Sequence, residues 1–163
     1  MPRVVRRTKT KGGKHTYRCD KCGNEIEPKQ VYLQWEFRYG GKYRRHAACG
    51  YPRPSELTQS KMGEVYAATE SVDDILAGDF DEAEIVAAME SAQETIQYVA
   101  DEYEQAAEPF GNAGENQERY EELDSWVSDF DSIDYTREDD EDDETWRDRI
   151  RDEVQGIIGN CPY

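Results

Sequence analysis

Three cysteines and one histidine occur as two short pairs, and this spacing constrains the fold more than any other feature of the sequence. Cys19-x2-Cys22 and His46-x2-Cys49 are separated by 23 residues. Each pair can supply one edge of a tetrahedron, and Cys3His is a common ligand set for structural zinc. Gly23 follows the first pair directly, where a metal-binding turn needs a residue that tolerates positive φ. We therefore expect one structural zinc ion, with no open position for a catalytic water.

Two other residues bear on this assignment. His15 lies four residues before Cys19 and could replace His46 as a ligand. Cys161 stands alone near the C-terminus, which is typical of a packed or free thiol. Alternatively, the three cysteines of the two pairs are ordinary buried thiols and His46 is a surface histidine, with no metal bound. Thiolates reserved for a metal suggest a reducing compartment, so we expect a cytoplasmic protein, in the host cytoplasm if a phage encodes it.

The segment between the two pairs has the pattern of a β-hairpin. Alternate residues from Val31 to Phe37 are apolar, which is strand periodicity. Gly40-Gly41 predicts a two-residue hairpin turn, because both positions can adopt positive φ. The return strand, from Lys42 to about Arg45, would carry the second ligand pair. This pattern predicts a zinc module over residues 17–54, ended by prolines and preceded by a basic arm over residues 1–16 that we expect to be disordered.

After the prolines the apolar residues recur every three or four positions, which predicts helices. The stepping residues are Met62, Val65, Thr69, Val72 and Leu76; Ile85, Met89, Ala92, Ile96, Val99, Tyr103 and Ala106; Tyr120, Leu123, Val127 and Phe130; and Trp146, Ile150, Val154 and Ile157. Ser55 or Ser60 is the expected first N-cap, and residues 109–114 are expected to break the helices. The fold class is therefore α+β: a zinc-bound hairpin module, then an acidic antiparallel helical bundle over residues 55–136. Residues 137–163 are expected to form an acidic linker and a short helix.

Charge is segregated along the chain. Residues 1–54 contain 14 Lys or Arg and 4 Asp or Glu, whereas residues 55–163 contain 6 and 33. Such asymmetry favours charged partners. The basic start lacks an apolar stretch typical of a secretory signal, and no run approaches the roughly 20 apolar residues of a membrane span. We therefore expect a soluble protein without a membrane partner.

The basic head combines cations with aromatic residues, a composition suited to nucleic acid. Cations neutralise phosphates, and aromatic rings stack on unpaired bases. DNA or RNA contacts are predicted at Arg18, Lys21, Arg38, Tyr39, Lys42, Tyr43, Arg44 and Arg45. The composition favours single strands or broken ends over base readout in a duplex. The alternative is that the aromatics form the small core, which we expect for Trp35 and Phe37, while the cations only keep the head soluble.

The stretch from Cys19 to Cys49, with Ile26 after the first pair and Arg45 before the histidine, resembles the PARP-type zinc finger of poly(ADP-ribose) polymerases. The resemblance covers roughly residues 17–50. It implies recognition of DNA ends and breaks through backbone contacts and stacking. Arg45 stands where that family commonly has an aromatic residue.

Residues 51–60 and the acidic helices look similar to uncharacterised proteins of tailed phages. LIM-type fingers share the first four metal ligands, but they need a second set of four ligands, which this chain lacks.

The acidic helices support two hypotheses. In the first, the finger of a phage accessory protein contacts nucleic acid while the helices dock a basic protein. In the second, the chain is an adaptor or an inhibitor of a host nucleic-acid enzyme, acting through acidic DNA mimicry with zinc purely structural. Solvated helix faces or salt adaptation also explain such acidity. We expect no enzyme, because the sequence has no nucleophile elbow, P-loop or dinucleotide fingerprint.

Overall fold

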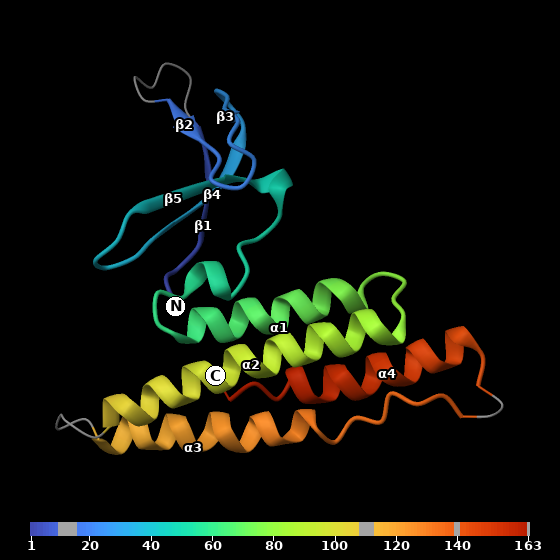
Figure 1. The fold of residues 1–163 in the computed structure, drawn as a ribbon. Coiled ribbons are helices and arrows are strands. Elements are labelled where there is room, and N and C mark those ends of the chain that lie inside the picture. The colour runs from blue at the N-terminus through green and yellow to red at the C-terminus, as the bar shows by residue number, and fades with distance from the viewer. Residues whose placement is uncertain (10–15, 108–112, 139–140, 163) are drawn as a thin grey trace. The chain divides into compact units, whose positions relative to one another are not determined.

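The structure, a computed structural model, describes residues 1–9, 16–107, 113–138 and 141–162. The chain divides into two units, Met1–Gln59 and Ser60–Tyr163. The first unit contains small antiparallel sheets and the second contains four helices, so the α+β class is confirmed (Figure 1).

A three-stranded antiparallel sheet organises the first unit. Its strands are β1 (Val5–Thr8), β4 (Val31–Glu36) and β5 (Lys42–His46), in the order β1-β4-β5. A second, two-stranded sheet pairs β2 (Tyr17–Arg18) with β3 (Glu25–Ile26). Two short 3-10 helices follow β5, over Ala47–Cys49 and Ser55–Leu57.

Strand β1 corrects the expectation of a disordered arm. Val5 pairs with Gln34 and Thr8 pairs with Val31, so the basic N-terminus forms an outer strand of the sheet. Lys9 continues this anchoring, since its Nζ donates to the carbonyl oxygen of Ile26 at 2.5 Å. The prediction failed because these residues pair with a strand far along the chain, and local periodicity does not report such a partner.

The register gives the two faces of the sheet different surroundings. Residues paired across antiparallel strands lie on the same face, and successive residues alternate between faces. Tyr32 pairs with His46, and Tyr32 packs in a small core with Cys19 and Ile26. Trp35 pairs with Tyr43 on the opposite face. Strand β4 therefore buries side chains on both faces.

The connection between β4 and β5 differs from the predicted two-residue turn. It spans residues 37–41, and the Gly40 N–H donates to the Phe37 carbonyl oxygen at 3.3 Å. Among the described glycines, Gly23 and Gly50 have positive φ, and Gly40 and Gly41 do not. Phe37 accordingly leaves the strand and is half-buried, whereas Trp35 is 3% exposed.

The second unit consists of α1 (Met62–Leu76), α2 (Glu82–Ala107), α3 (Ala113–Phe130) and α4 (Asp143–Ile158). All five stepping residues predicted for α1 are buried. The predicted serine N-cap is wrong, because Lys61 occupies the N-cap position of α1 and makes no side-chain cap. Ser55 instead begins a 3-10 helix in the first unit.

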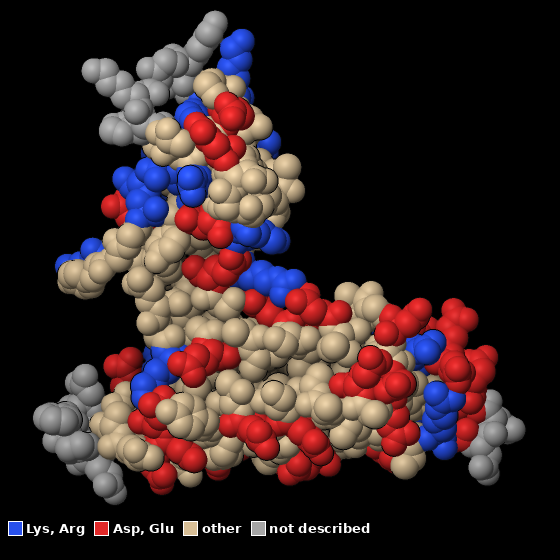
Figure 2. Space-filling view, turned by 45° about the horizontal axis from the view of Figure 1, so that its top comes forward, with Lys and Arg blue, Asp and Glu red and all other residues tan. Residues whose placement is uncertain are grey.

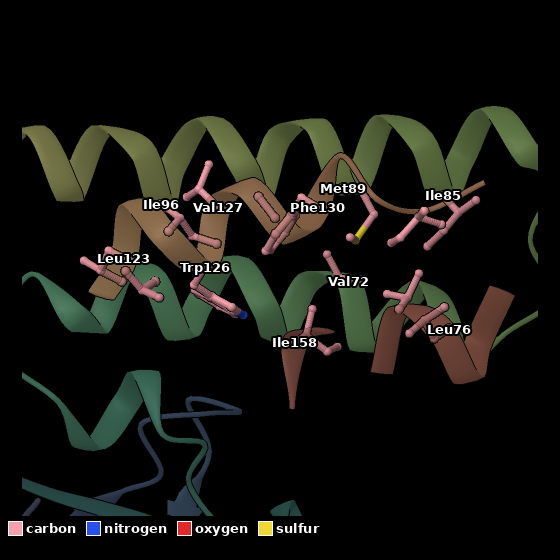
Figure 3. Packing of buried hydrophobic residues seen from close by; sticks show 14 of the residues in the cluster. Val72, Leu76, Ile85, Met89, Ile96, Leu123, Trp126, Val127, Phe130 and Ile158 are labelled. Carbon is pink, nitrogen blue, oxygen red and sulfur yellow. The ribbon is translucent and has the colours of Figure 1, made fainter. Parts of the chain in front are cut away.

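The four helices share one apolar core. Side chains from all four point toward one another, including Val72 of α1, Ile96 of α2, Phe130 of α3 and Ile158 of α4 (Figure 3). Trp146 is fully buried and its Nε1 donates to the Tyr135 carbonyl oxygen at 3.0 Å. The core therefore includes the last helix, which the sequence placed outside the main bundle.

Helices α2 and α3 run antiparallel. Asn116 Nδ2 donates to the Ala106 carbonyl oxygen at 3.2 Å, and Gln93 Nε2 donates to Asp131 Oδ1 at 3.0 Å. The apolar stepping predicted for α2 is wrong at its last residue, since Ala107 is buried while Ala106 is exposed. The predicted break over residues 109–114 lies mostly outside the described residues, but α3 already begins at Ala113.

Part of the acidic run at 138–144 belongs to α4. Asp142 is the N-cap, and its side chain accepts from the Thr145 backbone N–H at 2.8 Å. Asp143 and Glu144 occupy the first turn, where carboxylates interact favourably with the helix dipole. Glu141 pairs with Arg149 at 2.9 Å. The run is therefore not only a linker. Gly159 follows the helix, and Ile158 is buried whereas the predicted Ile157 is only partly buried.

Candidate metal centre

The first ligand pair lies in a tight turn after β2. The Gly23 N–H donates to the Cys19 carbonyl oxygen at 2.8 Å, and the Cys19 N–H donates to the Asn24 carbonyl oxygen at 2.8 Å. Gly23 has φ 72°, the left-handed conformation that its position predicted. This turn brings the sulfurs of Cys19 and Cys22 to the same side.

The second pair lies where β5 ends. His46 is the last residue of β5, and Cys49 ends the 3-10 helix that follows. Asp20 fixes this strand against the first turn. Its Oδ2 accepts from the Arg44 N–H at 2.5 Å, and its own N–H donates to the Arg44 carbonyl oxygen at 2.8 Å. Two bonds to one backbone position therefore bring the two ligand pairs together.

The donor atoms have the spacing of a tetrahedral site. Sγ of Cys19 lies 3.8 Å from Sγ of Cys49. Nδ1 of His46 lies 3.5 Å from Sγ of Cys22 and 3.9 Å from Sγ of Cys49. All four donors lie within 4.8 Å of one another. Zn–S bonds of about 2.3 Å at tetrahedral angles place two sulfurs about 3.8 Å apart, so the residues fit one zinc ion.

His46 is oriented by its second ring nitrogen. Nε2 lies 3.2 Å from the Glu25 carbonyl oxygen, which can only accept a hydrogen bond. The proton of the neutral ring therefore belongs on Nε2, and the lone pair of Nδ1 faces the sulfurs. Metal-bound histidines almost always have such a partner for the other nitrogen.

The pKa values of Cys19 and Cys49 differ because the two thiols have different surroundings. Burial raises the pKa of Cys19, but backbone N–H groups of Cys22, His46 and Lys21 lower it more, to about 6. Burial and the neighbouring Cys22 and Cys19 raise the pKa of Cys49 to about 11. Adjacent thiolates repel one another, and a divalent cation removes that repulsion as it displaces their protons.

The two alternative residues are not part of this cluster. Cys161 belongs to the second unit, where it packs partly buried against the helix core. Burial raises the pKa of its thiol to about 11, which makes it a poor nucleophile at neutral pH. His15 lies outside the described residues.

The predicted nucleic-acid residues lie at several places on the first unit. Arg18, Lys21, Arg38, Tyr39 and Lys42 are exposed. The Arg38 guanidinium carbon lies 5.1 Å from the centre of the Tyr39 ring, and Tyr39 is 87% exposed. Lys21 donates to the Cys49 carbonyl oxygen at 3.1 Å, and Lys42 pairs with Glu36 at 2.9 Å. These residues are therefore spread over the metal-binding turn and the hairpin.

Three further predicted residues are more enclosed. Tyr43 stacks on Trp35, with ring centres 5.7 Å apart and planes 13° apart. Arg44 lies over the Tyr17 ring at 4.1 Å. Arg45 is 2% exposed and forms an ion pair with Glu56, so its guanidinium faces the interior instead of a ligand.

The pairing of Arg45 also affects Glu56. Burial raises the pKa of this carboxyl, but hydrogen bonds from the Arg45 guanidinium and the Arg53 N–H lower it more, and the net shift is downward. Sequence reasoning missed both Glu56 and Asp20 as structural partners of β5. Neither residue lies in a pattern that reports a distant contact.

No family model, no curated protein and no solved structure matches this chain. The resemblance to PARP-type fingers therefore stays a prediction. None of the described helices is long and apolar enough to cross a bilayer.

Proposed function

We propose that this protein binds one zinc ion and uses its first unit to bind nucleic acid, with a preference for single strands or broken ends. The zinc ion would hold the turn after β2 against the end of β5. Because all four positions are filled by side chains, its role would be structural. The resemblance to PARP-type fingers supports the same preference, and the resemblance to phage proteins makes an accessory protein of a tailed phage the origin we favour.

The observation that carries the proposal is the contrast in cation pairing between the two units. In the second unit, each lysine and arginine pairs with a carboxylate or donates to a backbone carbonyl. In the described part of the first unit, six exposed cations make neither an ion pair nor a side-chain hydrogen bond. They are Arg3, Arg6, Arg7, Arg18, Lys29 and Arg38. Unpaired exposed cations can neutralise phosphates without first breaking an internal ion pair.

Tyr39 supports the preference for unpaired bases. Its ring lies in the connection between β4 and β5 and is almost fully exposed beside the Arg38 guanidinium. An exposed ring next to a cation can stack on a base while the cation contacts a phosphate. Duplex DNA offers no free base face except at ends and breaks, which explains the predicted order of affinity.

The test is a salt series with the full zinc-loaded chain and single-stranded, nicked and intact DNA, followed by fluorescence anisotropy. We expect binding that weakens with salt and is tightest for the single strand. Tyr39→Ala should weaken single-strand binding about tenfold and leave binding to the intact duplex unchanged. Tyr98→Ala is the matched control, because Tyr98 is an exposed tyrosine of α2. No binding to any DNA, or equal effects of both variants, contradicts the proposal.

The charge of the second unit favours a second candidate, a protein adaptor or inhibitor. Residues 60–163 hold 32 of the 37 acidic residues and 6 of the 20 lysines and arginines. Acidic side chains cover much of the visible helix surface in Figure 2. Such a surface suits a basic protein or mimicry of DNA. Neutralising exposed carboxylates of α3 should then abolish capture of a basic protein, while the zinc-loaded first unit would contribute nothing to it.

A further inference from the structure

A pocket lies on the face of the sheet opposite the metal cluster. Tyr32 and His46 share one face, and Trp35 and Tyr43 share the other, because paired residues lie together and neighbouring residues alternate. Trp35 and Tyr43 both line the pocket. None of the four metal ligands lines the pocket, although Asp20 of the lining lies between Cys19 and Cys22 in the sequence.

The pocket has the lining of a site for an organic cation. Its volume is about 300 Å³. Three aromatic rings, two carboxylates and two neutral polar side chains surround it, without a lysine or arginine. The lining residues are Trp35, Phe37, Tyr43, Asp20, Glu56, Thr58 and Gln59. Aromatic faces and carboxylates together attract a cation and exclude an anion.

The aromatic rings form a corner. Phe37 and Tyr43 meet edge to face, with ring centres 5.7 Å apart and planes at 86°. Trp35 stacks nearly parallel to Tyr43. Two walls at a right angle let one cation contact ring faces from two directions, as in the aromatic cages that recognise quaternary ammonium groups.

The charge balance of the lining leaves one carboxylate for a ligand. Glu56 is already paired with Arg45. Asp20 accepts from a backbone N–H of Arg44 but forms no ion pair within the described residues. The nearby Arg44 side chain instead lies over Tyr17, and Lys42 pairs with Glu36. Asp20 is thus the one carboxylate of the lining without an ion pair, while Glu56 is compensated by Arg45 and also lies near the charge of Lys21.

The protein already places a cation against the same tryptophan. The Arg45 guanidinium carbon lies 5.7 Å from the centre of the Trp35 ring. The Trp35 ring therefore already takes part in one cation–aromatic contact. Trp35 Nε1 is buried and has no acceptor among the described residues.

We propose that this pocket binds the methylated ammonium group of a lysine side chain on a partner peptide. Methylation favours this cation over plain lysine, because an unmodified ammonium is strongly hydrated and its water would have to be removed. The aromatic corner contacts the methyl groups, and Asp20 balances the charge. The four metal ligands and the six exposed cations of the nucleic-acid proposal do not line this pocket.

The test uses the full zinc-loaded chain and a small probe, Nα-acetyl-trimethyllysine N-methylamide, in an NMR shift titration. The matched ligand is its neutral isostere, in which carbon replaces the charged nitrogen. We expect the cation to bind about tenfold more tightly than the isostere, with shifts at Trp35 and Tyr43. Asp20→Asn, which keeps an oxygen acceptor for the Arg44 N–H, should remove most of that difference.

Two further variants separate the pocket from its surroundings. Phe37→Leu should weaken binding of the cation about fivefold, since it removes one aromatic ring of the pocket and keeps an apolar side chain. Tyr51→Leu should leave the affinity for the cation unchanged, because Tyr51 is an exposed tyrosine of the same unit that does not line the pocket. Zinc content confirms that each variant keeps its site. Equal affinity for the cation and the isostere overturns the proposal. Stronger shifts at the same residues with adenosine monophosphate also overturn it, in favour of a nucleobase.

Discussion

Arg45 and Glu56 form an ion pair whose two side chains differ greatly in exposure. The Arg45 side chain is 3% exposed and the Glu56 side chain is 37% exposed. Arg45 also donates to the Tyr51 carbonyl oxygen at 3.3 Å, so it ties the end of β5 to the segment that follows the metal ligands. The buried partner depends on the pair far more than the exposed one does.

This asymmetry predicts unequal effects of two substitutions. Glu56→Gln leaves a buried guanidinium without a counter-charge and should lower the free energy of unfolding by about 2 kcal/mol, less than a fully buried pair would lose. Arg45→Met fills the space and leaves Glu56 free to reach water, so it should cost less than about 1 kcal/mol. Urea titrations followed by NMR signals of β4 and β5 measure both. A larger loss for Arg45→Met contradicts this account.

Arg45 also shows what the sequence could not predict. Its position in an alternating strand is consistent with either face, and only the pairing with Leu33 places it inward. Strand β1 was missed for a related reason, because its stability comes from a partner about 26 residues away and not from its own pattern. The contacts of Asp20 with Arg44 likewise depend on the register of β5.

The features that were predicted are those encoded locally. The Cys-x2-Cys turn with Gly23 is a local geometry, and the two ligand pairs meet as expected. Helical stepping is likewise local, and the buried residues from Met62 to Leu76 follow it throughout. Errors appear at element ends, such as Ala106 and the start of α4, where capping and packing decide the outcome. The predicted nucleic-acid contacts remain predictions.

The backbone conformation of Gly23 predicts that a side chain at this position lowers the affinity for zinc. Its φ of 72° costs an L-residue about 1 kcal/mol, although a Cβ there would meet no atom within 4 Å. Gly23→Ala should therefore weaken zinc binding about fivefold, as measured by competition with a chelator. Gly23→Asn is the matched control and should weaken it less, since asparagine tolerates this region better. If both variants lose the same zinc affinity, the positive φ at position 23 does not account for the loss.

The ion pair of Glu141 with Arg149 predicts a pH-dependent stability of the helices. The Arg149 hydrogen bond is the main cause that lowers the pKa of Glu141 below its ordinary value of 4.5, and burial only partly opposes it. A carboxyl with a lowered pKa stabilises the fold above pH 4.5, and this stabilisation is lost as the pH falls through the folded value. Glu141→Gln should therefore destabilise the helices at pH 7 and have a smaller effect at pH 3.

Urea denaturation followed by helical circular dichroism at both pH values measures this difference. Glu94→Gln is the control, because it removes the same charge from an exposed position in the interior of α2 without a described ion pair. A destabilisation by Glu141→Gln that is as large at pH 3 as at pH 7 would mean that the side chain acts through packing instead of charge.

Two glycines near the end of α4 predict effects of opposite sign for the same substitution. Gly156 lies inside the helix, and an added Cβ would meet nothing within 4 Å. Gly156→Ala should therefore raise the free energy of unfolding by about 1 kcal/mol through helix propensity. At Gly159 the added Cβ would lie 2.8 Å from the Gln155 carbonyl oxygen, a backbone atom that cannot move away without disturbing the last turn. Gly159→Ala should therefore lower the melting temperature while Gly156→Ala raises it, and shifts of the same sign would show that the steric contact at Gly159 does not govern the helix end.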